Sequence, residues 1–171
     1  MSIEKEVHFF DMDGTLLFSP LPDPGKDIYA QKKGKPFPHI GWWSKPESLD
    51  QEIFDIPTKP EIDAIYREVH KDENKHAILL TNRIFRLENE AKKVLHSHGM
   101  YFEHYSFKNN NHEKGQRILA IMTKYYPDVK NIVFYDDDQK HLDNAIEVLG
   151  HLDFNLKLVK VSSDLDYLNQ N

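Results

Sequence analysis

Two clusters of aspartates stand at the ends of short apolar segments, and their spacing suits them to chemistry. Asp11 and Asp13 lie in the motif Asp-Met-Asp-Gly-Thr, directly after an apolar run, and Asp136–Asp138 follow a second apolar run. Carboxylates that converge without cysteine or histidine form a site of hard oxygen ligands, which suits Mg²⁺ better than zinc. Because the carboxylates repel one another, we expect a cation to balance them.

The elements that must position these aspartates alternate along the chain. Short apolar strands are predicted at 7–11, 77–80, 102–107, 131–135 and 156–161, with amphipathic helices between them. This alternation predicts an α/β domain with a Rossmann-like central parallel sheet and helices on both faces. Ligand sites of such sheets lie beyond the carboxyl ends of the strands, so Asp11, Thr81 and Asp136 should converge.

The stretch 18–60 differs from the rest of the chain. It contains eight of the nine prolines and both tryptophans, Trp42 and Trp43. Such a composition predicts an irregular segment rich in turns, and a loop of this length is more often functional than idle. We therefore expect a single domain over residues 1–171 in which 18–60 form an insert that acts as a minimal cap.

Composition excludes several classes of protein. A chain of 171 residues has the size of one ordinary domain, and its net charge of -6 argues against nonspecific coating of nucleic acid. Without cysteine there is no disulfide framework and no thiolate zinc site. The chain begins without an apolar signal core and has no apolar segment long enough to span a membrane, so we expect a cytoplasmic protein. Nothing in the sequence indicates an obligate protein partner.

Several motifs resemble those of the haloacid dehalogenase-like (HAD) phosphohydrolase superfamily. The segment 11–16, Asp-Met-Asp-Gly-Thr-Leu, resembles its first motif, Leu79–Asn82 its second, and 135–138 its fourth. The third motif is a lysine or arginine that opens the helix before the fourth strand. Lys114 fits this position best, and Lys108 competes with it because it also ends a predicted strand.

This resemblance implies Mg²⁺-dependent hydrolysis of phosphomonoesters. Asp11 would attack phosphorus and form an aspartyl-phosphate, while Asp13 would protonate the leaving oxygen and then deprotonate the attacking water. The resemblance places Mg²⁺ on Asp11, on the Asp13 carbonyl, and on either Asp136 or Asp137. The other residues that it implies to be catalytic, through contacts with the phosphoryl group, are Thr81 and Lys114.

A narrower similarity links the chain to the Swiss Army Knife RNA repair-like branch of that superfamily. It rests on Gly41-Trp42-Trp43, Thr81-Asn82-Arg83, Phe107-Lys108, and Asp137 followed by His141. The chain has Thr-Asn-Arg where that branch usually has Thr-Gly-Arg, and Asp-Asp-Asp where it usually has Glu-Asp-Arg. The similarity implies a phosphorylated polynucleotide end as the substrate.

Substrate contacts are predicted at the insert and after the second motif. One alternative is that at least one of Trp42 and Trp43 stacks on a nucleobase or another planar leaving group. The other is that both tryptophans anchor the insert to the domain. Five lysines and one aspartate give residues 26–45 a local charge of +4, which suits a nucleotide or a nucleic-acid terminal phosphate. Arg83 either grips a phosphate or pairs with a carboxylate. The remaining predicted substrate contacts are Asn82 and Lys108.

Two other functions fit the same sequence. One is a phosphatase for small metabolites, with a closed site and tryptophans packed inward. The other is a noncatalytic binding or regulatory module on the same fold, against which the intact pair Asp11 and Asp13 argues.

Overall fold

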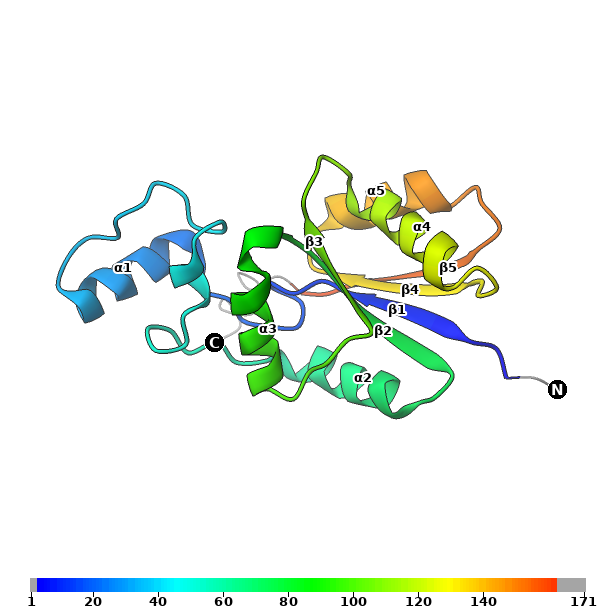
Figure 1. The fold of residues 1–171 in the computed structure, drawn as a ribbon, viewed down its shortest axis with the longest axis horizontal. Helices are drawn as coiled ribbons and strands as arrows, with labels where there is room; N and C mark the ends of the chain where they lie inside the picture. Colours follow the sequence, from blue (N-terminus) through cyan, green and yellow to red (C-terminus); the bar gives the residue numbers. More distant parts are fainter. Residues whose placement is uncertain (1–2, 163–171) are drawn as a thin grey trace.

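A computed structural model describes residues 3–162 of the chain. Its five strands form one sheet in the order β3-β2-β1-β4-β5, and every neighbouring pair is parallel. Figure 1 shows this sheet with helices on both sides, so the predicted α/β fold is confirmed. In chain order the elements are β1 (Glu6–Phe10), α1 (Pro22–Lys33), η1 (Pro46–Leu49), α2 (Pro60–Lys71), β2 (Lys75–Ile84), η2 (Phe85–Leu87), α3 (Glu88–Ser97), β3 (His104–Lys108), α4 (Lys114–Tyr125), β4 (Asn131–Asp136), α5 (Gln139–Leu149) and β5 (Asn155–Lys160).

Two apolar clusters hold the layers together, one on each face of the sheet. Helices α2 and α3 pack on one face through Ile62, Tyr66 and Val94 among others, and α4 and α5 pack on the other through residues such as Ile118 and Leu142. Figure 1 shows α4 and α5 on the side of the sheet opposite α2. No helix within residues 3–162 has both the length and the apolar character needed to cross a bilayer.

The central strands bring the two aspartate clusters to the same edge of the sheet. Strand β1 runs beside β4 with Phe10 opposite Tyr135, and the Asp11 amide donates to the Tyr135 carbonyl at 3.0 Å. The next residue of each strand is an aspartate, Asp11 and Asp136. Parallel pairing in this register therefore places both carboxylates at the carboxyl ends of the strands.

Strand β2 is longer than the predicted segment and does not end at Thr81. It continues to Ile84 after a register shift against β3, which pairs Leu80 with Ser106 but Ile84 with Lys108. The Arg117 guanidinium reaches into this irregular stretch. It donates to the carbonyls of Thr81 at 2.6 Å and Ser106 at 2.7 Å, so both acceptors are satisfied where the regular ladder is interrupted.

The insert is not the irregular loop that its prolines predict, because it contains the twelve-residue helix α1. Two of its prolines fall where a helix tolerates them. Pro22 and Pro24 stand in the first turn, where no intrahelical partner exists for the missing N–H. Gly34 then ends the helix with a φ of 69°.

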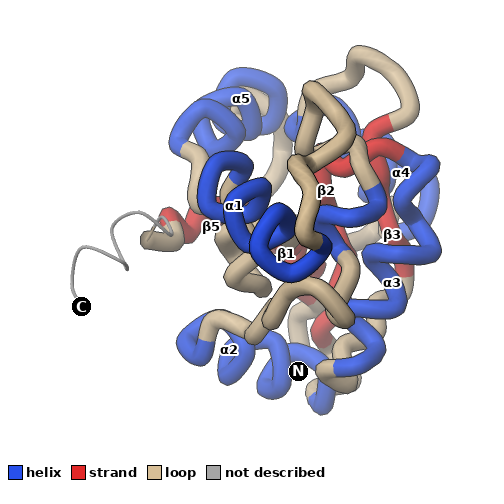
Figure 2. Tube along the Cα trace, turned by 90° about the vertical axis from the view of Figure 1, so that its left-hand side faces the viewer, coloured by secondary structure: helices blue, strands red, loops and turns tan. Residues whose placement is uncertain are grey.

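The two ends of the insert lie side by side. Leu17 pairs with Thr58 in an antiparallel bridge, and the Phe18 amide donates to the Pro57 carbonyl at 2.8 Å. Figure 1 shows the insert beyond one end of the sheet, and in Figure 2, viewed from that end, α1 lies in front of the sheet. The insert therefore leaves the domain after β1 and rejoins it next to the point where it left.

Candidate active site

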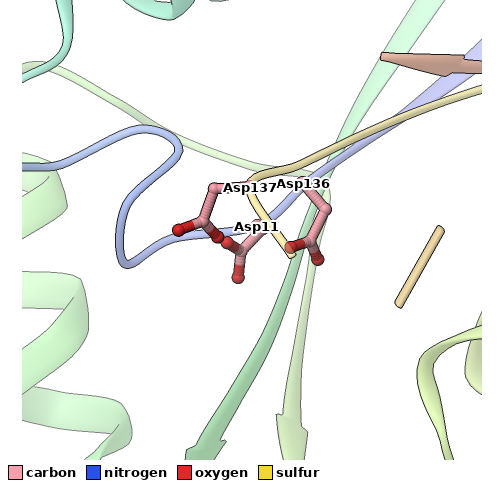
Figure 3. Close-up of side chains that lie close together, drawn as sticks. All are labelled: Asp11, Asp136 and Asp137. Carbon is pink, nitrogen blue, oxygen red and sulfur yellow. The ribbon is translucent and has the colours of Figure 1, made fainter. Parts of the chain in front are cut away.

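The carboxylates of Asp11, Asp136 and Asp137 converge at the carboxyl ends of β1 and β4 (Figure 3). One oxygen of each lies within 4.8 Å of the others. Asp11 and Asp136 are buried, while Asp137 is partly exposed. The expected meeting of the two aspartate clusters thus occurs in the fold.

A glycine makes room for this cluster. Gly14 has a φ of +77°, and a Cβ on it would lie 2.2 Å from an oxygen of Asp137. The tight turn after Asp11 therefore needs glycine for its backbone angle and also for space. Two side chains secure the turn: the Thr15 hydroxyl donates to Asp11 at 2.8 Å, and Lys59 donates to the Gly14 carbonyl at 2.7 Å.

Lys114 is the cation of this cluster. Its Nζ donates to Asp11 at 2.8 Å and to Asp136 at 2.6 Å, and the residue is only 1% exposed. It is the first residue of α4, where the Glu113 side chain caps the helix. Lys108 lies at the end of β3 and is exposed to solvent. Of the two lysines considered for the third motif, only Lys114 therefore contacts the carboxylates.

Burial and pairing act in opposite directions on these groups. Burial raises the pKa of Asp11 to about 6, although Lys114 opposes the shift. Burial also works to raise the pKa of Asp136, but hydrogen bonds from His141 and Lys114 outweigh it and the pKa falls below its ordinary value. Lys114 has a raised pKa, because Asp11 and Asp136 together outweigh its burial. At neutral pH the cluster is therefore two buried carboxylates bridged by one ammonium, with Asp137 beside them.

The donor set fits a hard divalent cation. Three carboxylates face one another, and Lys114 supplies one positive charge against them. Within residues 3–162 no other group of histidine, cysteine or acidic side chains comes together in this way. All-oxygen ligation of this kind suits Mg²⁺. Asp11, Asp136 and Asp137 are the side chains that could hold it.

Asp13 is held by Arg83 rather than by the cluster. The guanidinium of Arg83 donates through Nε and Nη2 to the two oxygens of Asp13, both at 2.9 Å. Arg83 is 3% exposed, and its Nη1 is engaged by the Trp43 carbonyl and the Ser48 hydroxyl. Of the two predicted partners for Arg83, the structure has a carboxylate and leaves little of the guanidinium for a phosphate.

Thr81 and Asn82 also lie at this edge of the sheet. The Thr81 hydroxyl accepts a hydrogen bond from the Arg83 amide at 3.0 Å. The side-chain oxygen Oδ1 of Asn82 accepts from Arg117 at 2.8 Å, and the side-chain nitrogen Nδ2 of Asn82 lies 3.2 Å from Nε2 of His141. The other ring nitrogen of His141 lies 3.2 Å from Asp136. Asn82 is therefore connected to the carboxylate cluster through His141.

Arg117 is a residue that the sequence analysis missed. Burial lowers its pKa to about 10, so it stays charged at neutral pH. It stands three residues after Lys114 on α4, a spacing that puts both side chains on one face of the helix. That spacing was a usable signal, because a helix face that presents Lys114 to the strand ends presents Arg117 to them as well.

The two tryptophans have different environments. Trp42 is 4% exposed, its indole N–H donates to the Pro20 carbonyl at 2.8 Å, and its ring packs on Phe54. A Cβ on Gly25 would lie 2.4 Å from that ring, so α1 packs closely on it. Trp42 is therefore an anchor of the insert and does not reach the site. Trp43 is 40% exposed and lines the pocket described next.

A pocket of about 480 Å³ opens over the cluster. Asp11 and Lys114 reach it from the strand ends, and Trp43 and Leu21 line it from the insert. The predicted residues Trp42, Lys108 and Asp136 are outside the lining, but Asp136 is hydrogen-bonded to Lys114 and His141, which belong to it. The other lining residues are Asp13, Gly14, Thr81, Asn82, Arg83, Asp137, Asp138 and His141.

The parallel sheet with the aspartate loop after its central strand is the fold of HAD-like hydrolases. Residues 19–171 match the family described as HAD domain family 1 in Swiss Army Knife RNA repair proteins, and the chain belongs to this family. The matched stretch begins after the Asp11–Thr15 loop. A comparison with curated proteins finds no match.

Solved structures share the fold at low sequence identity. A chain of a Pnkp1/Rnl/Hen1 complex matches with a TM-score of 0.58 and 11% identity over 94% of this chain, which spans 47% of that chain. A haloacid dehalogenase-like hydrolase from Streptococcus pneumoniae matches with a TM-score of 0.55 and 12% identity, covering 97% of this chain and 90% of that one. A predicted phosphoglycolate phosphatase from Haemophilus somnus matches with a TM-score of 0.59 and 13% identity over 95% and 88%.

Proposed function

We propose that the protein is a Mg²⁺-dependent phosphomonoesterase that works through an aspartyl-phosphate on Asp11. The observation that carries the proposal is the arrangement around this carboxylate. Asp11 lies at the floor of the pocket, one oxygen accepts from Lys114 and the other from Thr15, and Asp137 and Asp136 lie beside it. A carboxylate so oriented is a suitable nucleophile for phosphorus.

Two aspartates divide the covalent chemistry. An oxygen of Asp11 forms a bond to phosphorus as the bond from phosphorus to the leaving oxygen breaks, and Asp13, which enters this step protonated, gives that oxygen its proton. Water then attacks the aspartyl-phosphate and loses a proton to Asp13, which releases inorganic phosphate and restores both carboxyl groups. Asp13 is suited to this role because its side chain is partly exposed and lines the pocket.

Other side chains of the pocket would bind the phosphoryl group. Lys114 balances its negative charge, and the Thr81 hydroxyl and the Asn82 amide lie at the pocket wall as hydrogen-bond partners. Mg²⁺ held by Asp11, Asp136 and Asp137 would reduce the repulsion between the nucleophile and the anionic substrate. Asp138 caps α5 by accepting from the Lys140 amide at 2.9 Å, so a structural role suffices for it.

For the substrate we propose a nucleotide or a nucleic-acid terminal phosphate. Family membership supports this class, since the family is described from RNA repair proteins. The exposed ring of Trp43 at the pocket supports it as well, because aromatic faces stack on bases. On this proposal residues 18–60 act as a minimal cap that carries the stacking residue, and the +4 charge of 26–45 attracts the polyanion.

A second candidate is a phosphatase for small metabolites. The pocket favours it in one respect, since Leu21 and Trp43 of the insert help to line it and its volume is about 480 Å³. That volume lies within the usual range for small-molecule sites. The noncatalytic alternative has no comparable support, because Asp11, Asp13 and Lys114 are all in place.

The test is phosphate release with and without Mg²⁺ from a matched panel of substrates. The panel contains 3′- and 5′-phosphorylated RNA and DNA oligonucleotides, mononucleotides, and sugar phosphates. We expect Mg²⁺-dependent turnover with a preference for oligonucleotide ends. Preference for small phosphates would retain the phosphatase and overturn the substrate class.

One substitution tests the intermediate. Asp11→Asn should abolish turnover and the trapping of phosphate on the protein, while Asp128→Asn, the same change at an exposed aspartate in the turn after α4, should leave both intact. Full activity of folded Asp11→Asn would show that the nucleophile is another group.

A further inference from the structure

Arg83 connects the insert to Asp13, the proposed general acid and base. Its guanidinium makes a bidentate pair with Asp13, both N–O distances being 2.9 Å. A planar fork that grips both carboxylate oxygens fixes the plane as well as the position of the carboxyl group, which a lysine does not do. The orientation of Asp13 is therefore set by the orientation of Arg83.

The insert sets the orientation of Arg83. Nη1 donates to the Trp43 carbonyl at 2.7 Å and to the Ser48 hydroxyl at 2.6 Å, and the guanidinium carbon lies 4.9 Å from the centre of the Trp43 ring. Ser48 is fully buried, and its own hydroxyl donates to the Lys45 carbonyl at 2.6 Å. Both hydrogen-bonded partners of Nη1 thus belong to the insert, and Ser48 is itself buried and hydrogen-bonded.

We propose that Arg83 is a positioning residue, set by the insert, that holds the Asp13 carboxyl group in line for proton transfer. This inference rests on the proposed function, because it concerns the proton that Asp13 gives to the leaving oxygen. On this proposal the insert orients the residue that transfers the proton, in addition to lining the site. A contact between Arg83 and the phosphate is disfavoured, since four of its five N–H groups already have partners.

The leaving group distinguishes this role from a structural one. Departure of 4-nitrophenolate needs no proton, whereas an alkyl oxygen must be protonated as its bond to phosphorus breaks. A residue that acts through the acid should therefore matter for alkyl phosphates and little for 4-nitrophenyl phosphate. A residue that holds the fold, or binds the phosphoryl group, should matter equally for both.

The experiment is a double-mutant cycle on Arg83→Gln and Asp13→Asn. Release of the leaving group is measured in single turnover, with 4-nitrophenyl phosphate and with the alkyl phosphate that the wild type hydrolyses fastest. Arg83→Gln should lose on the order of 10²-fold with the alkyl phosphate, the usual size of a misplacement near 1 Å, and far less with the aryl one. Added to Asp13→Asn, it should cost nothing more, because residues that act as a unit are not additive.

Variants in the insert give a second, independent readout. Ser48→Ala removes one acceptor from Nη1, and we expect a loss of about 2- to 10-fold with the alkyl phosphate alone, the usual effect of one hydrogen bond. Ile40→Ala is the matched control, since Ile40 is in the same insert and 99% exposed. Arg83→Lys keeps the charge without the fork and should rescue little. If Arg83→Gln does not fold, the comparison of Ser48→Ala with Ile40→Ala still tests whether the insert affects the hydrolysis of the alkyl phosphate alone.

Three results would overturn the inference. They are additive losses in the cycle, equal losses with both leaving groups, and a raised half-saturating substrate concentration for Arg83→Gln in the Asp13→Asn background. The last would make Arg83 a phosphate ligand. A wild-type protein that hydrolyses neither substrate would instead overturn the proposed function, and this inference with it.

Discussion

Replacing Lys114 by methionine tests the electrostatics of the site most directly. Methionine keeps most of the side-chain length and its packing, but it removes the ammonium that lies between Asp11 and Asp136. Two buried carboxylates then face each other without the ammonium that bridges them. Removing one partner of a buried ion pair costs about 3–5 kcal/mol, and we expect a loss of that size in the free energy of unfolding at pH 7.5 without Mg²⁺.

The loss should shrink on acidification. Burial already raises the pKa of Asp11 to about 6 with Lys114 present, and without Lys114 the pKa rises further. A carboxyl whose pKa is raised in the folded state binds its proton there first. The folded state is therefore stabilised as the pH falls below the folded-state pKa. The gain is about 1.4 kcal/mol for each pH unit until the pH reaches the unfolded-state pKa. The difference between variant and wild type should narrow clearly between pH 7.5 and 5.5.

Urea unfolding followed by circular dichroism at the two pH values measures both effects. Lys108→Met is the control, since Lys108 is an exposed lysine at the end of β3 and its loss should change stability by less than about 0.5 kcal/mol. The reasoning fails if the two methionine variants are equally stable, or if the deficit of Lys114→Met is the same at both pH values.

Three further predictions concern other parts of the structure. Gly14→Ala should lose about 1–2 kcal/mol from its φ of +77° and should bind Mg²⁺ at least about ten-fold more weakly in a titration, because the new Cβ displaces Asp137. Trp42→Ala should cost about 3–5 kcal/mol in urea unfolding, whereas Trp43→Ala should leave stability nearly unchanged and raise the KM for oligonucleotides; the opposite assignment would contradict the packing described above. Burial lowers the pKa of His8 below its ordinary value despite Glu6, so stability that is present above about pH 6.5 should be lost as the pH falls. In His8→Gln the free energy of unfolding should fall less steeply between pH 7 and 5. An unchanged dependence on pH would show that His8 is not the cause of this loss.

The order of strands and helices was open to prediction because it depends on local patterns. In short apolar segments such as 131–135, and in amphipathic ones such as α5, the local sequence pattern indicates which residues are buried. The aspartates follow two of these strands, so their meeting needed only the rule that parallel strands end at one edge. The helix α1 escaped prediction because its prolines read as turn signals, although prolines in the first turn are compatible with a helix.

The partners of the site residues could not be predicted in this way. Whether Arg83 pairs with a phosphate or with Asp13, seventy positions away, depends on where the strand and the loop come to rest. The choice between Lys114 and Lys108 likewise depends on which side chain the start of α4 directs at Asp11.

The sequence by itself determined the parallel α/β architecture, the family motifs and the convergence of Asp11 with Asp136, because these follow from apolar periodicity and from residue types at strand ends. Only the tertiary structure decided that Trp42 packs while Trp43 faces the pocket, and that Arg83 joins Asp13 to the insert. The reason is physical: neighbouring residues of one type carry the same local signal, and only packing against distant segments makes one of them buried and the other accessible.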